Sequence, residues 1–171
     1  MNNTAENKSE RALRALLKSL MREFFQTETS ALQHCRREAE RLSEAAPART
    51  LREIADQAEQ FLKELPGIAK ANDLPRSPGG VAVGAFFSEA RDKLFDRLIR
   101  AERSYRGTML GVRHGVDLVH LLAEAANEGG LRDLSLFCER WLAGREPLLA
   151  RLEQDLVFFA KQPAWAMRFA R

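Results

Sequence analysis

The chain has 171 residues and a mass of 19.3 kDa, which predicts a single domain able to fold without disulfides or a structural metal. Apolar residues make up 45% and charged residues 30%, a balance that excludes a disordered or collagen-like chain. The net charge is only +3, and basic side chains are interleaved with acidic ones. This pattern argues against a nucleic-acid partner.

Several features favour a cytoplasmic location. The first ten residues are polar and lack the apolar core of a signal peptide. The most apolar stretches are far shorter than the roughly 20 residues that a membrane-spanning helix needs. Cys35 and Cys138 lack the paired spacing of a zinc or redox site, and isolated thiols are typical of a reducing compartment. The excess of arginine over lysine indicates a GC-rich, bacterial source.

Apolar residues at helical spacing predict two helices in the first part of the chain. The first runs from Ser9 to about Ala45, where Pro47 ends it. The second runs over 51–71, because Thr50 and Glu53 match a capping box. The apolar stripe of the first helix comprises Leu13, Leu17, Leu20, Phe24, Ala31, Cys35 and Leu42; that of the second comprises Leu51, Ile54, Ala58, Phe61, Leu65 and Ile68.

Residues 72–84, with two prolines and three glycines, are predicted to form a loop. A third helix is expected over 85–128, a turn at Gly129-Gly130, and a fourth helix over 131–162 with a kink or break near Pro147. Residues 163–171 form a tail, expected to dock onto the helices. The third stripe comprises Leu94, Leu98, Ala101, Tyr105, Val112, Val116, Val119 and Ala123; the fourth comprises Leu134, Cys138, Trp141, Leu148, Leu152, Leu156 and Phe159.

Four amphipathic helices joined by short connections predict an all-α fold, an antiparallel up-down-up-down four-helix bundle with uneven helix lengths. In that order the first and third helices run parallel. Glu28 and Glu102 then lie at similar heights, and Asp155 on the fourth helix reaches roughly the same level.

This arrangement of long helices and interior carboxylates resembles the ferritin-like four-helix bundle superfamily. The resemblance implies a metal or redox site holding Fe or Mn, with Glu28, Glu102 and Asp155 as possible ligands. The family's signature also includes two Glu-x-x-His motifs. This sequence contains none, and the nearest substitute is Asp117-x-x-His120. The competing interpretation is that these glutamates are buried and paired with an arginine such as Arg106, or bonded to Tyr105.

Gly107, Gly111 and Gly115 recur every four residues within the third helix. Glycine costs about 1 kcal/mol relative to alanine in a helix interior, so three at this spacing require a reason. They predict a smooth groove for close helix packing, inside the bundle or at an interface. In a competing interpretation the groove holds a ligand, with Arg106 and Arg113 binding an anion.

Other ligand sites are less specific. Gly79–Gly84 lacks the preceding strand and the Lys-Ser/Thr ending of a phosphate loop. Arg76, together with the free amides at the start of the third helix, is a possible anion contact. A pocket near Tyr105 and Met109 for a small molecule is a further alternative.

No complete catalytic set is present, and no histidine is placed near a candidate nucleophile. The sequence therefore favours a non-enzymatic helical module, without a cofactor, that self-associates or binds a helical partner. The alternative is a ferritin-like metal-binding protein with a degenerate carboxylate site.

Overall fold

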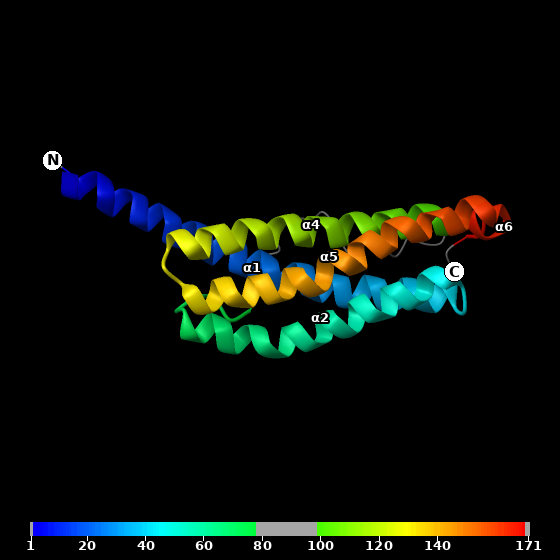
Figure 1. Ribbon diagram of the computed structural model, residues 1–171, viewed down its shortest axis with the longest axis horizontal. Coiled ribbons are helices and arrows are strands. Elements are labelled where there is room, and N and C mark those ends of the chain that lie inside the picture. Colours follow the sequence, from blue (N-terminus) through cyan, green and yellow to red (C-terminus); the bar gives the residue numbers. More distant parts are fainter. Residues whose placement is uncertain (1, 78–98, 170–171) are drawn as a thin grey trace.

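The computed structural model describes residues 2–77 and 99–169, and within these ranges the chain is helical (Figure 1). An isolated bridge between Arg100 and Phe169 is the one β-type pairing in this part of the chain. The prediction of an all-α fold is confirmed. The helices are α1 (Asn2–Leu42), α2 (Ala46–Ala71), α4 (Ala101–Glu128), α5 (Arg132–Lys161) and α6 (Pro163–Ala166).

The turn between α1 and α2 differs from the prediction. Helix α1 ends at Leu42, and Ser43 takes a positive φ of 52° that breaks the helix. Pro47 lies in the first turn of α2, where its missing N–H costs nothing, so it begins a helix instead of ending one. The predicted capping box is wrong, because Thr50 and Glu53 already lie inside α2.

Helix α4 begins at Ala101, and residues 99 and 100 are not helical. The prediction of a continuous helix over 85–128 is therefore wrong at these two residues. The C-terminal tail causes this start: Arg100 is extended (φ −71°, ψ 150°), and the Ala101 N–H donates to the Arg168 carbonyl at 2.8 Å. The predicted helical residues 85–98, and residues 78–84 of the predicted loop, lie outside the described residues.

The second half of the chain follows the prediction more closely. Helices α4 and α5 are joined through Gly129 and Gly130, and Gly130 has a φ of 67°. The predicted break near Pro147 is wrong, because α5 continues through this residue as one helix. The tail docks onto the helices as expected: the Trp165 ring lies 6.2 Å from that of Phe158 on α5.

The four long helices form two antiparallel hairpins, α1–α2 and α4–α5, that pack on each other. Helix α1 contacts α2 and α4, and α5 contacts the same two helices. Leu17 on α1 lies near Gly129, whereas Glu38 bonds to Ser104, so α1 and α4 are antiparallel. Thr50 and Gln57 on α2 meet Asp155 and Arg145 on α5, so this pair is antiparallel too.

The up-down-up-down order is therefore wrong, because α2 and α4 run in the same direction (Figure 1). Short turns force the two helices of each hairpin to be antiparallel. Ser77 and Ile99, the described residues on either side of positions 78–98, lie at opposite ends of the molecule. Helical periodicity carries no information about this direction.

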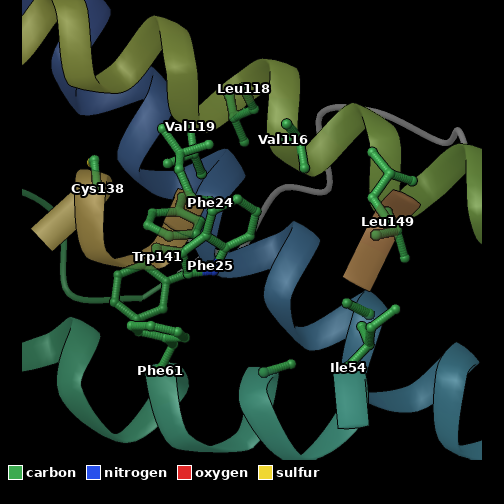
Figure 2. Packing of buried hydrophobic residues seen from close by; sticks show 14 of the residues in the cluster. Phe24, Phe25, Ile54, Phe61, Val116, Leu118, Val119, Cys138, Trp141 and Leu149 are labelled. Atoms are coloured by element: carbon green, nitrogen blue, oxygen red, sulfur yellow. The ribbon is translucent and has the colours of Figure 1, made fainter. Parts of the chain in front are cut away.

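The predicted stripes supply the core. Phe24, Phe25, Phe61 and Trp141 gather where α1, α2 and α5 meet, and residues of α4 close the core from the other side (Figure 2). The Phe24 and Trp141 rings meet edge to face at 5.5 Å. Burial of one stripe from each helix in a common core explains why all four are ordered together.

Within the described ranges, none of the helices has the length and apolar character needed to cross a membrane.

Candidate functional site

A buried ion pair lies in the middle of the core. The Arg145 guanidinium on α5 donates to the Glu28 carboxylate on α1 at 3.0 Å, and both side chains are only 1% exposed. Arg145 also donates from Nε to the Gln57 side chain at 2.5 Å, and its Cζ lies 4.6 Å from the centre of the Trp141 ring. One cation thereby links α1, α2 and α5.

Helical spacing explains how these polar groups reach the core. Glu28 lies one turn after Phe24, and Arg145 lies one turn after Trp141, so both continue buried apolar stripes. Gly144 makes room for the cluster, because a Cβ there would collide with the Gln57 amide nitrogen. The small residue thus lets Gln57 remain in contact with Arg145.

The Glu28 carboxyl is unusually poor in partners for a buried acid. Burial raises its pKa above the ordinary value of 4.5, and this effect outweighs the lowering by the Arg145 guanidinium. The nearby Trp141 N–H also lowers this pKa, but its geometry falls short of a hydrogen bond and leaves Glu28 Oε1 and Trp141 Nε1 without one. The cluster is therefore anchored by Arg145.

The raised pKa of Glu28 predicts how stability changes with pH. Because the folded chain binds this proton more tightly than the unfolded chain, the free energy of unfolding falls as pH rises from 4.5 through the raised pKa. Urea unfolding of the wild type and Glu28→Gln, from about pH 4 to about pH 8, measures the effect. We expect the stability of the wild type relative to the variant to decrease with rising pH. An increase would contradict the prediction.

Two further buried polar side chains, Glu38 and Tyr105, form bonds in the core. Glu38 accepts a hydrogen bond from Ser104 at 2.6 Å and pairs with Arg41 at 3.3 Å. The buried Tyr105 hydroxyl donates to the Leu152 carbonyl at 3.0 Å, and burial raises the pKa of this tyrosine. The Glu38–Ser104 and Tyr105–Leu152 bonds join different helices, which is a structural use of polar side chains.

Neither cysteine is set up as a nucleophile. Cys35 and Cys138 are free and fully buried, and burial raises the pKa of each thiol to about 12. A catalytic cysteine needs an accessible thiolate. These two thiols behave as small apolar core residues.

Comparison with known proteins gave no relative. No family model, curated protein or solved structure matches this chain. The assignment of a function therefore depends on the geometry of the chain itself.

The structure does not bring the three predicted metal ligands together. Glu28 is held by Arg145, Glu102 pairs with Arg106 at 2.8 Å on the surface, and Asp155 accepts a hydrogen bond from Thr50 at 2.7 Å. In the described ranges, no three His, Cys, Asp or Glu side chains form a group that could hold a metal ion. A guanidinium occupies the place beside Glu28, so this donor set does not fit the di-metal centre that the ferritin-like resemblance implies.

The described residues test the candidate anion contacts only in part. Arg76 follows the end of α2, which lies near the start of α1 through the Arg14–Asp73 ion pair. The predicted start of the third helix, near residue 85, lies outside the described residues, so the contact between Arg76 and its first amides stays a prediction. Arg106 and Arg113 are bound to Glu102 and Glu153 respectively.

The three glycines of α4 have different surroundings. Gly115 is buried, and a Cβ there would lie 3.8 Å from Trp141 Cη2 and 4.0 Å from Thr27 Cβ. Gly111 is half-buried. A Cβ on Gly107 would have no neighbour within 4 Å. Gly115 therefore contributes to packing inside the core, whereas Gly107 faces outward.

Substitutions at Gly115 test this packing. Alanine fits at ordinary contact distances, so Gly115→Ala is expected to raise the free energy of unfolding by up to about 1 kcal/mol through helix propensity. Leucine would push against Trp141, so Gly115→Leu is expected to lower it by about 1–3 kcal/mol. Urea unfolding measures both, with Gly107→Ala as the control at an open position. Equal stability of the two Gly115 variants would refute the packing role.

The sequence did not single out Arg145, the residue that organises the buried cluster. A signal was present, because Arg145 follows Trp141 at one helical turn on the buried stripe. The sequence did anticipate that Glu28 could be buried and paired with an arginine, but Arg106 is not that partner.

A separate feature lies on the outer face of α4, away from α1 and α5. Leu110 is 63% exposed and Leu121 is 50% exposed, and the two lie three turns apart on the same side of the helix. Gly107 lies one turn before Leu110. The face is bordered by the His114–Glu23 contact toward α1 and the Arg113–Glu153 pair toward α5.

Proposed function

We propose that this chain is a non-enzymatic helical module that binds a protein, either a second copy or another helical partner, through the outer face of α4. In this proposal the four long helices form a four-helix bundle with one long crossover, in the cytoplasm. The core supplies a rigid platform. The exposed leucines of α4 supply the contact surface.

The observation that carries the proposal is the exposure of Leu110 and Leu121 on one side of α4. An exposed leucine by itself is normal on a protein surface. Two on one helical face, three turns apart and beside an open glycine, present apolar side chains on which another helix can pack. The interior polar groups, by contrast, are used in bonds between the chain's own helices.

A double substitution tests the proposal. In Leu110→Asp/Leu121→Asp we expect loss of association, because charge on both contact residues opposes burial. Leu136→Asp on α5 is the matched control, since Leu136 is 51% exposed and lies on another helix. Light scattering measures the mass, and a photo-reactive residue at position 110 or 136 reports which face contacts a protein. Adducts from neither position, with a monomeric wild type, would refute the proposal.

The ferritin-like alternative ranks second, and one observation favours it. Consecutive helices α2 and α4 run in the same direction, and ferritin-like folds have one long crossover connection. The separated carboxylates count against it. Metal analysis after loading with Fe(II) and Mn(II) decides: about two ions per chain, lost in Glu28→Ala, would promote this alternative. Binding of less than about a tenth of an ion would retire it.

A further inference from the structure

We propose that the partner of the α4 face is a second copy of this chain, with the two α4 helices antiparallel across a two-fold axis. In this arrangement Leu110 packs against Leu121 of the partner subunit, and the symmetry repeats the contact. The inference rests on the proposed function, and it adds the identity and the orientation of the partner.

The α4 outer face consists of the residues that lie at helical spacing on the side of Leu110. Its positions are arranged symmetrically about a midpoint along the helix. Moving outward from the midpoint between His114 and Asp117, the pairs of positions are 114 and 117, 110 and 121, 107 and 124, and 103 and 128. In an antiparallel helix pair on a two-fold axis, residues equally distant from the midpoint face each other. His114 lies at the border of the face, where it contacts Glu23 on α1. The face itself comprises Arg103, Gly107, Leu110, Asp117, Leu121, Glu124 and Glu128, all exposed except the half-buried Gly107.

The charges of this face have opposite signs in its two halves. Arg103 is the charged residue of the first half, whereas Asp117, Glu124 and Glu128 follow the midpoint; the nearby Arg106 and Arg113 are already paired with Glu102 and Glu153. An antiparallel second copy brings Arg103 of each chain against the acidic half of the other, facing Glu128 of the partner subunit. A parallel copy would superimpose like charges, which is unfavourable. Charge complementarity therefore selects both the occupant and its direction.

Most of these charges have no partner of their own. Arg103, Asp117, Glu124 and Glu128 form no ion pair within the described residues. Their order also opposes the helix dipole, which favours acidic groups at the start of a helix and basic groups at its end. Arg103 lies in the first turn of α4, and Glu128 is its last residue. An antiparallel neighbour would place a compensating charge at each end.

The apolar contacts fit the same register. Leu110 and Leu121 are separated by three turns, so the two-fold axis creates two leucine contacts about 16 Å apart. Gly107 presents no side chain and has open space above it, which allows the partner helix to approach. Gly107 then faces Glu124 of the partner subunit, next to Arg106.

Mixed cysteine variants test the direction. Leu110→Cys and Leu121→Cys are prepared separately and combined under mild oxidation, and mass spectrometry detects the disulfide. We expect the mixed disulfide, because these positions face each other. Leu110→Cys alone is expected to give little product, since its two copies would be about 16 Å apart, beyond disulfide reach. The native Cys35 and Cys138 are buried, and a Leu136→Cys variant controls for random collision.

Charge reversal tests the register. Arg103→Glu and Glu128→Arg are each expected to raise the dimer dissociation constant about fivefold or more, since each change makes two attractive contacts repulsive. The doubly reversed chain is expected to recover wild-type association. Arg49→Glu on α2, a change of equal charge away from the face, is expected to leave it unchanged. Sedimentation measures the constants, and thermal unfolding checks that the variants fold.

The outcomes separate this inference from the proposed function. Disulfide formation in Leu110→Cys alone, or no recovery in the doubly reversed chain, would overturn the antiparallel pairing and leave the α4 face as a binding surface. The wild type could stay monomeric at about 100 µM while position 110 cross-links to another protein. That result would overturn the proposal that the partner is a second copy, and it would leave the proposed function standing. A monomeric wild type without adducts would overturn both proposals.

Discussion

Replacing Arg145 by methionine is expected to lower the free energy of unfolding by about 3–5 kcal/mol, because removing one partner of a buried ion pair leaves the other charge uncompensated. Glu28 is 1% exposed, and Arg145 is the one partner that donates a hydrogen bond to it within the described residues. Gln57 would also lose its contact with Arg145. Urea unfolding at neutral pH measures the change.

The double variant Glu28→Leu/Arg145→Met distinguishes two causes of the lost stability: the loss of the ion pair itself, and the burial of a charge that has no partner. Replacing both charges by apolar groups of similar volume is expected to restore most of the stability. Arg49→Met is the control for an exposed pair, since Arg49 and Glu53 lie 3.7 Å apart at the surface, and it is expected to cost less than about 1 kcal/mol. A double variant as unstable as Arg145→Met alone would show that the pair is not the cause.

Trp141→Ala is expected to lower the free energy of unfolding by about 3–5 kcal/mol, the usual cost of removing a large aromatic side chain from a core. Trp141 is fully buried, meets Phe24 edge to face and lies below the Arg145 guanidinium. Gly115 on α4 leaves the space that the ring fills. The lost volume therefore opens a cavity among α1, α4 and α5.

The control for Trp141→Ala is Phe169→Ala, because Phe169 is an exposed aromatic residue and its loss creates no cavity. We expect that change to stay within about 0.5 kcal/mol. Fluorescence gives an independent check: with Trp165→Phe as background, Trp141 is the remaining tryptophan and reports from a dry site. Similar losses in the alanine variants of Trp141 and Phe169 would contradict this assignment of the core.

The sequence predicted the helices and their buried faces well, because period and burial are directly linked. Leu20, Phe24 and Cys35 on α1 are buried as expected, and Ile54 and Phe61 on α2 are too. Helix boundaries were less accurate. Pro47 lies in the first turn of α2, only a few residues after α1 ends. In the sequence, a proline that ends one helix and a proline that begins the next are therefore hard to tell apart.

Helical periodicity could not predict the direction in which the third long helix runs. A stripe is the same whether its helix runs up or down, so Glu28 and Glu102 were placed at one level on an assumed direction. In the structure Glu28 lies level with Arg145 near the middle of the core, whereas Glu102 lies near the start of α4. The predicted carboxylate layer depended on that assumption.

The burial of Arg145 could not be inferred from residue type, because arginines are mostly exposed. Its place on the stripe of Trp141 and Leu152 was the available signal. The acid partner was easier to identify, since Glu28 lies between Phe24 and Ala31 on a strongly apolar face. Which arginine neutralises it depends on contacts between distant helices, and these only the folded structure supplies.

The arrangement in two hairpins also bears on the order of folding. Each hairpin closes through a turn of three residues, so its two helices are closer in sequence than the helices that meet between the hairpins. Glu28 belongs to the first hairpin and Arg145 to the second, 117 positions later in the chain, and they meet only when the hairpins dock. Docking shifted by one helical turn would bury both charges without partners. The ion pair thus favours the one alignment of the two hairpins in which Glu28 and Arg145 meet.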